Sequence, residues 1–147
     1  MVAKFFKLQQ VLTYRCDMEK LRKQEFAVAK QGLEQAHHKL GREEELVERL
    51  SQEFRKSQQD IGCIDDIQMY SAFFARKRDE INQQKEQIRC LDRVMNEKRH
   101  DLMEASKEKK VLESLKVKKA EEFRQDMAIK ERNFLDEISV QKKVKSA

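Results

Sequence analysis

Hydrophobic residues in the first part of the chain recur at an alternating spacing of three and four. From Phe5 to Ile61 this spacing defines a seam of seventeen positions, of which twelve are apolar, against 39% hydrophobic residues in the whole chain. The seam consists of Phe5, Leu8, Leu12, Arg15, Glu19, Arg22, Phe26, Ala29, Leu33, Ala36, Leu40, Glu43, Val47, Leu50, Phe54, Ser57 and Ile61. An unbroken 3-4 spacing is typical of the a and d positions of a left-handed coiled coil. A helix on the surface of a globular body has a wider and shorter apolar stripe.

The pattern breaks once, between Ser57 and Asp66. Gly62 suits the end of a helix because it adopts the left-handed conformation without a steric penalty. Asp65 or Asp66 can cap the next helix, since a carboxylate accepts hydrogen bonds from free N–H groups. We therefore predict one coiled-coil hairpin over 1–147, with helices over about 4–60 and 66–141, a turn over about 61–65 and a frayed tail over 142–147.

A second seam of fourteen positions, ten of them apolar, follows the turn. It consists of Ile67, Tyr70, Phe74, Lys77, Ile81, Gln84, Ile88, Leu91, Met95, Lys98, Leu102, Ala105, Lys109 and Leu112. Beyond Leu112 the spacing loosens towards an eleven-residue repeat, which locally unwinds a supercoil.

A short connection makes the two helices antiparallel neighbours, so the numbers of facing residues add to about 125 to 127. The sequence therefore predicts an all-α fold whose second helix is longer and overhangs the terminal end, over about Glu122–Gln141. The overhang carries Phe123, Met127, Phe134, Leu135 and Ile138. Apolar residues without a partner helix suggest that another protein covers them; a frayed or self-associating end is the alternative.

Three of the four charged residues of the first seam lie close together. In the predicted register Arg15, Glu19 and Arg22 face roughly Glu104–Lys110. Ion pairs between the helices would fix their alignment, because polar seam residues specify register at a cost in stability. The alternative is that these residues bind a partner.

Composition excludes several classes of protein. The chain is 40% charged, with three glycines and no proline, which disfavours sheet folds rich in turns. No apolar run reaches the roughly 18 residues of a membrane helix, and we expect no signal peptide. The odd number of cysteines (Cys16, Cys63 and Cys90) favours a reducing, cytoplasmic compartment.

Residues that carry catalytic or ligand chemistry are not arranged into a site. His37 and His38 are adjacent and so point about 100° apart on a helix, and the sequence has no phosphate-binding or nucleophile motif. We expect no metal, no cofactor and no enzymatic activity. The net charge is +5, but the lysines of residues 107–119 are interleaved with glutamates, so a nucleic-acid-binding protein is a less favoured alternative.

The residues just after the turn form a different kind of surface. Met69 to Ala75 read Met-Tyr-Ser-Ala-Phe-Phe-Ala, with Tyr70 and Phe74 on the seam. Phe73 lies one position off the seam and is expected to be partly exposed beside Met69. The pair is a candidate docking patch, with an ordinary exposed phenylalanine as the alternative.

Several segments in order resemble one protein family. They are an opening of the type Phe5-x-x-Leu8-x-x-Val11-Leu12-x-x-Arg15-x-x-x-Glu19, a central Tyr70-x-x-Phe73-Phe74 followed by Ile81-x-Gln83, and a run from Lys109-Lys110-x-Leu112-Glu113-x-Leu115-Lys116 to Glu131-x-x-x-Leu135-Asp136-Glu137. Together with the hairpin pattern, they resemble the flagellar export protein FliJ family over nearly the whole chain.

The resemblance implies a stalk-like accessory protein of the flagellar type III export apparatus, at the inner face of the cell membrane. Its expected partners are a hexameric export ATPase, the cytoplasmic part of the membrane export gate and export chaperones. The residues implied or suggested at the ATPase end are Arg15, Glu19, Phe123, Met127, Glu131, Phe134, Asp136 and Glu137. Those suggested at the gate are Met69, Tyr70, Phe73 and Lys77.

One departure concerns Lys77, because family patterns often place an apolar residue four positions after the phenylalanine. A homodimeric coiled-coil spacer is the main alternative function, since the seams alone support it equally well. We expect no nucleic acid and no membrane insertion.

Overall fold

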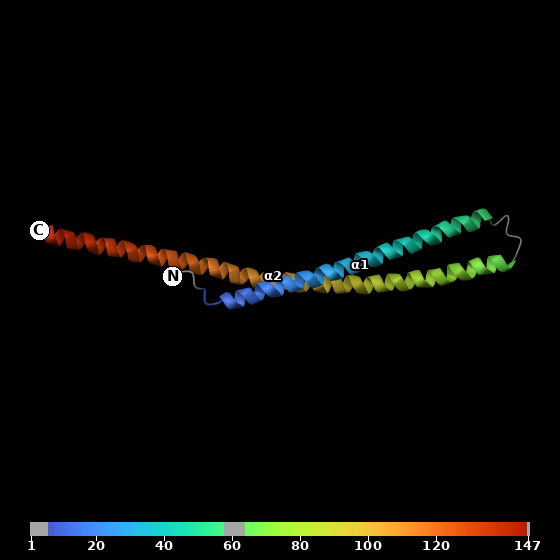
Figure 1. The fold of residues 1–147 in the computed structure, drawn as a ribbon, viewed down its shortest axis with the longest axis horizontal. Coiled ribbons are helices and arrows are strands. Elements are labelled where there is room, and N and C mark those ends of the chain that lie inside the picture. The colour runs from blue at the N-terminus through green and yellow to red at the C-terminus, as the bar shows by residue number, and fades with distance from the viewer. Residues whose placement is uncertain (1–5, 58–63, 147) are drawn as a thin grey trace. The chain divides into compact units, whose positions relative to one another are not determined.

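The computed structural model describes residues 6–57 and 64–146, and within them the chain forms two long α-helices (Figure 1). Helix α1 spans Gln9–Ser57 and helix α2 spans Ile64–Ser146, with 49 and 83 residues. The prediction of an all-helical chain with two long helices packed against each other, the second longer, is confirmed. Most of the predicted turn, including Gly62, lies outside the described residues.

The helix ends carry the charges that the helix dipole favours. Asp65 and Asp66 lie in the first turn of α2, as the sequence predicted, and Arg55 and Lys56 lie in the last turn of α1. Carboxylates are favoured where N–H groups are free and cations where carbonyls are free.

The boundaries of the helices differ from the predicted ones by a few residues. Helix α1 begins at Gln9 rather than near residue 4, and the Gln9 N–H donates to the Phe6 carbonyl at 3.0 Å in the turn before it. Helix α2 runs on through 142–146, a tail that the sequence predicted to fray. Proline is absent from the chain, so nothing in this tail forces the helix to end earlier.

The chain divides into two compact units, which we call the terminal unit (Met1–Leu21 and Met103–Ala147) and the tip unit (Arg22–Leu102). In the terminal unit, Arg15 pairs with Glu108 and Gln9 accepts from Lys116. In the tip unit, Lys98 pairs with Glu25. The numbers in these pairs add to 123, 125 and 123, so the helices are antiparallel within each unit, in a register close to the predicted one.

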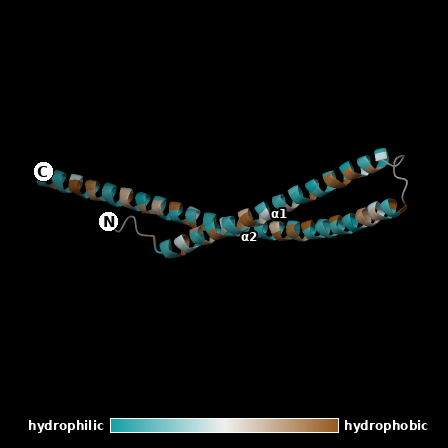
Figure 2. Cartoon of the chain, turned by 45° about the vertical axis from the view of Figure 1, so that its right-hand side comes forward, coloured by the Kyte–Doolittle hydropathy of each residue, from teal (hydrophilic) through white to brown (hydrophobic). Residues whose placement is uncertain are grey.

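The core of each unit is a single seam. Among the described residues the buried apolar ones are Leu12 and Ala105 in the terminal unit and Leu33 in the tip unit, exposed by 5%, 8% and 7%. All three lie on predicted seams. Two helices cannot enclose a thick core, and brown apolar positions recur at intervals along both helices (Figure 2).

In the terminal unit, α2 continues beyond the start of α1 (Figure 1). The first residue of α1, Gln9, lies opposite Lys116. Residues 117–145, which we call the terminal segment, therefore extend about 40 Å past that point at 1.5 Å per residue. Neither helix, over the residues described, is long and apolar enough to cross a membrane.

Candidate functional site

The tip unit contains a hollow between the two helices, with a volume of about 530 Å³. We call it the tip hollow, and it is lined by Leu50 of α1 and by Met69, Tyr70, Ala72, Phe73 and Arg76 of α2. Leu50 and Tyr70 are seam positions, and the other lining residues lie on the face of α2 beside the seam.

Aromatic rings from both helices pack together beside the tip hollow. Phe54 of α1 lies against Tyr70 and Phe74 of α2, with ring centroids 5.0 and 6.2 Å apart. Tyr70 and Phe74 stack on each other at 6.4 Å. Rings in tilted and offset arrangements stabilise one another beyond the area that they bury, so this cluster supports Tyr70, which lines the tip hollow.

The tip hollow lies beside exposed apolar residues of α2. Met69, which lines it, is 65% exposed, and Ile64 and Ile67, at the start of the helix, are 72% and 41% exposed. Phe73 is half-buried, as the sequence predicted. Its ring has two cations near it, the Arg76 guanidinium carbon at 5.7 Å and the Lys77 Nζ at 5.8 Å from the centroid.

The structure therefore brings three of the four predicted gate residues together, Met69, Tyr70 and Phe73. The fourth, Lys77, does not line the hollow: its ammonium hydrogen-bonds Glu43 of α1 at 3.0 Å. Sequence reasoning missed Arg76 as a member of the site, because nothing in the periodic pattern distinguishes it from other surface arginines.

In the terminal unit, Arg15 and Glu19 lie in ion pairs between the helices, as the sequence proposed. Arg15 pairs with Glu108, and Lys109 donates to Glu19 at 3.0 Å. Glu19 is only 6% exposed, and its hydrogen bond raises the pKa of Lys109 above the usual value. In the tip unit, Arg22 donates a hydrogen bond to Glu25 on its own helix at 3.0 Å.

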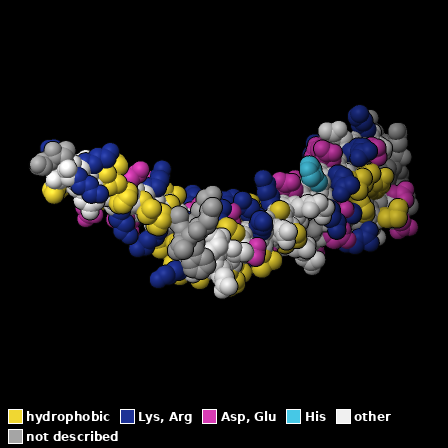
Figure 3. All heavy atoms as spheres, turned by 60° about the vertical axis from the view of Figure 1, so that its left-hand side comes forward, with side chains coloured by type: hydrophobic (Ala, Val, Ile, Leu, Met, Phe, Trp, Pro, Cys, Tyr) yellow, Lys and Arg dark blue, Asp and Glu magenta, His cyan; other side chains and the backbone are white. Residues whose placement is uncertain are grey.

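The terminal segment exposes large apolar side chains. They are Val117 (68%), Met127 (49%), Ile129 (52%), Phe134 (62%), Leu135 (57%), Val140 (60%) and Val144 (72%). Phe123 and Ile138 are half-buried. Hydrophobic and basic side chains both reach the surface on the face of this segment that Figure 3 shows.

These side chains do not share one face. Successive residues turn by about 100° on an α-helix, so Met127 and Phe134 lie about 20° apart, while Ile129 lies about 160° from Met127. Leu135 lies about 100° from Phe134. The terminal segment is thus apolar on several sides. Ile129, Val140 and Val144 were missed from sequence, because they fit neither seam.

The eight residues predicted at the ATPase end fall into two groups. Glu131, Asp136 and Glu137 are exposed on the terminal segment, near Phe134. Arg15 and Glu19 lie beside Glu108 and Lys109 instead. Because Phe134 follows Lys109 by 25 residues on α2, the two groups are about 38 Å apart along that helix.

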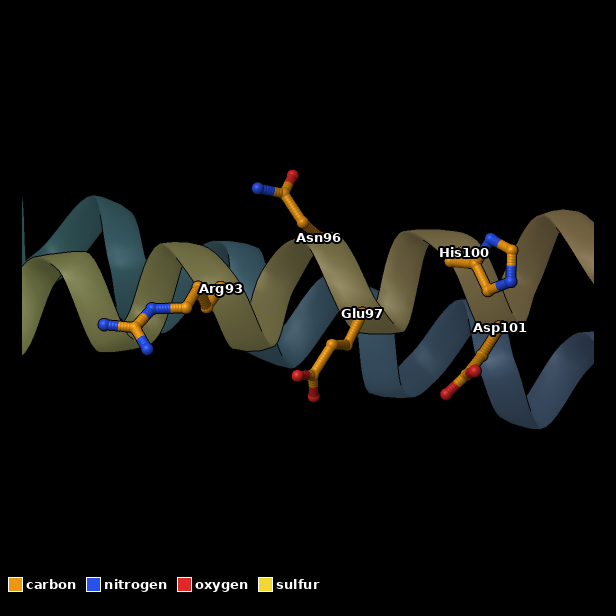
Figure 4. A pocket seen from close by; sticks show the side chains of 5 residues that line it. All are labelled: Arg93, Asn96, Glu97, His100 and Asp101. Carbon is orange, nitrogen blue, oxygen red and sulfur yellow. The ribbon is translucent and has the colours of Figure 1, made fainter.

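A second, shallower hollow lies on α2 alone, lined by Arg93, Asn96, Glu97, His100 and Asp101. Figure 4 shows these side chains pointing in different directions around the helix, with no common centre. In the described parts of the chain, no three metal-ligating side chains come together. The arrangement offers neither a metal centre nor a nucleophile beside a base.

Comparison with known protein families gives a match over nearly the whole chain. The family model described as "Flagellar FliJ protein" matches residues 4–146. No curated protein and no solved structure matches the chain. With nearly its whole length matched, the chain belongs to the flagellar FliJ family and is a non-catalytic component of the flagellar export apparatus.

Proposed function

We propose that the chain is a stalk that binds the hexameric export ATPase through its terminal segment and promotes the assembly and activity of the ring. The observation that carries this proposal is the distribution of apolar side chains in the terminal segment. Met127 and Ile129 lie on nearly opposite sides of α2, and each is about half exposed.

A helix that packs on a flat surface needs only one apolar stripe. A helix with exposed apolar residues on several sides is better suited to a site that surrounds it, such as the central hole of a ring. The acidic side chains of Glu131, Asp136 and Glu137 on the same segment give it polar contacts for a basic lining. Each subunit of the ring would then meet a different face of one stiff helix.

We further propose that the tip hollow docks on the cytoplasmic part of the membrane export gate. A hollow lined by Tyr70, Phe73 and Arg76 has the composition of binding hot spots, in which aromatic and arginine side chains dominate. The protein would link the ATPase ring to the gate at the inner face of the cell membrane, and it would also contact export chaperones.

The test is the rate of ATP hydrolysis by the export ATPase from the same source, titrated with the purified chain. We expect stimulation that saturates near one chain per six ATPase subunits. Phe134→Ala should raise the half-maximal concentration about tenfold or more, as loss of a central aromatic anchor does. Val28→Ala is the control, because Val28 is 70% exposed but lies on α1 in the tip unit.

Two results would overturn the proposal: no stimulation with no co-elution, or equal effects of Phe134→Ala and Val28→Ala. Met127→Pro, which breaks the helix within the terminal segment, provides a second variant. If it left stimulation intact, the terminal segment would not be the contact.

The second candidate function is a homodimeric spacer, favoured by the same exposed apolar side chains. Sedimentation separates the two candidates, since a mass near 17.6 kDa at low concentration excludes an obligate dimer.

A further inference from the structure

Lys77 occupies a seam position of α2, where the spacing calls for an apolar side chain. The structure shows why a lysine is accommodated there. The side chain is only 17% exposed, and its ammonium lies 3.0 Å from a carboxylate oxygen of Glu43 on α1 and 3.2 Å from one of Glu80 on α2. These hydrogen bonds, first the one to Glu43 and then the one to Glu80, raise the pKa of Lys77 above its usual value.

A lysine held in this way is not available to reach a partner. Its ammonium already pairs with two carboxylates, and most of its side chain is buried between the helices. A contact residue for a docking protein would instead present its charge to solvent.

The same ammonium lies 5.8 Å from the centroid of the Phe73 ring. Cations within about 6 Å of a ring face are attracted by its quadrupole. Phe74 packs against Phe73 edge-on with centroids 5.7 Å apart, and Arg76 lies on the ring as well. Of the two cations, Lys77 is the one tied to the other helix, because Glu43 belongs to α1.

We propose that Lys77 is a positioning residue, fixed by Glu43 and Glu80, that holds the ring of Phe73 in place on the wall of the tip hollow. It makes the docking surface rigid before a partner arrives, which lowers the entropy lost on binding. This inference rests on the proposed docking role of the tip hollow. In this inference Lys77 supports the docking surface and does not itself contact the partner.

The first test needs no partner. The full chain is labelled with 4-fluorophenylalanine, and the Phe73 signal in the ¹⁹F spectrum is assigned by its loss in Phe73→Leu. We expect Lys77→Met to shift or broaden the Phe73 signal and to leave in place the signals of the phenylalanines that do not contact Phe73. Lys77→Arg, which keeps a cation between the carboxylates and the ring, should restore it.

Lys98→Met is the matched control. Lys98 is also a seam lysine of α2 paired with a glutamate of α1, Glu25 at 3.6 Å, but it lies 25 residues from Phe73 along α2. It should leave the Phe73 signal unchanged. Glu43→Gln should reproduce the effect of Lys77→Met, which keeps the test decisive if Lys77→Met fails to fold.

The second test measures affinity for the purified cytoplasmic domain of the export gate protein from the same source. Lys77→Met should weaken binding about three- to tenfold, the range expected for loss of one cation–π contact. Lys77→Arg should stay within about twofold of the wild type on the same scale.

The two tests address different claims, so one can fail while the other succeeds. If the gate domain does not bind the wild-type chain, the docking role is wrong while the spectrum still decides whether Lys77 positions Phe73. An unchanged Phe73 signal in Lys77→Met and Glu43→Gln would overturn the positioning role, whatever the affinity. Equal changes in all phenylalanine signals would also overturn it, because they would indicate general loosening of the tip unit.

Discussion

The seam predicts how the stability cost of a Leu→Ala substitution depends on the position of the leucine. Leu12 and Leu21 lie nine residues apart on α1, both in the terminal unit. Leu12 is on the seam and 5% exposed, whereas Leu21 is off it and 45% exposed. Replacing each leucine by alanine removes the same atoms from two different environments.

The expected magnitudes follow from burial. Full burial of a leucine side chain stabilises a fold by about 1.5–3 kcal/mol, and Leu→Ala substitutions in thick cores cost about 2–5 kcal/mol because a cavity remains. A seam between two helices is one layer thick, so the neighbours of Leu12 can close most of the gap. We therefore expect Leu12→Ala to cost about 2–3 kcal/mol and Leu21→Ala to cost less than about 1 kcal/mol.

The assay is urea unfolding at 25 °C followed by the helical signal at 222 nm, with thermal unfolding as a second measure. For a chain of this length about 2–3 kcal/mol corresponds to a fall in Tm of about 4–12 °C. Equal losses from the two substitutions, or a larger loss from Leu21→Ala, would refute the assignment of the seam and the packing of α1 on α2 in the terminal unit.

Two further substitutions test local features of α1. Gly32 and Gly41 are interior to the helix, and a Cβ at either position would meet nothing within 4 Å, so Gly32→Ala and Gly41→Ala should each raise stability by about 0.5–1 kcal/mol in the same urea assay. Glu25 has a pKa lowered from 4.5, chiefly by the hydrogen bond from Arg22. The contribution of Glu25 to the stability of the fold is therefore present above pH 4.5 and is lost as pH falls through the lower folded-state pKa. Glu25→Gln should reduce the loss of helical signal that is measured as the pH is lowered. An unchanged loss would contradict the assigned cause of the pKa shift.

The sequence alone could predict the seam because a coiled coil leaves little freedom. Each helix must turn the same face to its partner at every turn, so spacing identifies the contacts. Leu12, Leu33 and Ala105 were placed on the seam by spacing and are the buried apolar residues of the described chain. The pairing of Glu19 with Lys109 could be predicted from the sequence for the same reason, since the position of the turn sets the helix register to within a few residues.

The tip hollow could not be predicted as a cavity. Its shape depends on the side-chain rotamers of Tyr70, Phe73 and Arg76, and spacing does not encode rotamers. The exposed faces of the terminal segment were only partly predicted. Ile129 and Val140 lie eleven residues apart but off the rows of Phe123 and Met127, because no second helix selects the positions that must be apolar there.

The charges within the seams bear on which helices pair. Every lysine of the predicted α2 seam meets a glutamate of α1: Lys77 with Glu43 and Lys98 with Glu25 in the tip unit, and Lys109 with Glu19 in the terminal unit.

These three pairs disfavour the pairing of α2 with a second copy of α2. In such a pair the seam lysines would lose the glutamates of α1 that they meet here, and breaking a partly buried ion pair is destabilising. The seam lysines therefore favour α1 as the partner of α2, and a homodimer of parallel chains would lose all three pairs. Because Gln9, the first residue of α1, lies opposite Lys116, the pairing with α1 ends there and the terminal segment continues past the start of that helix.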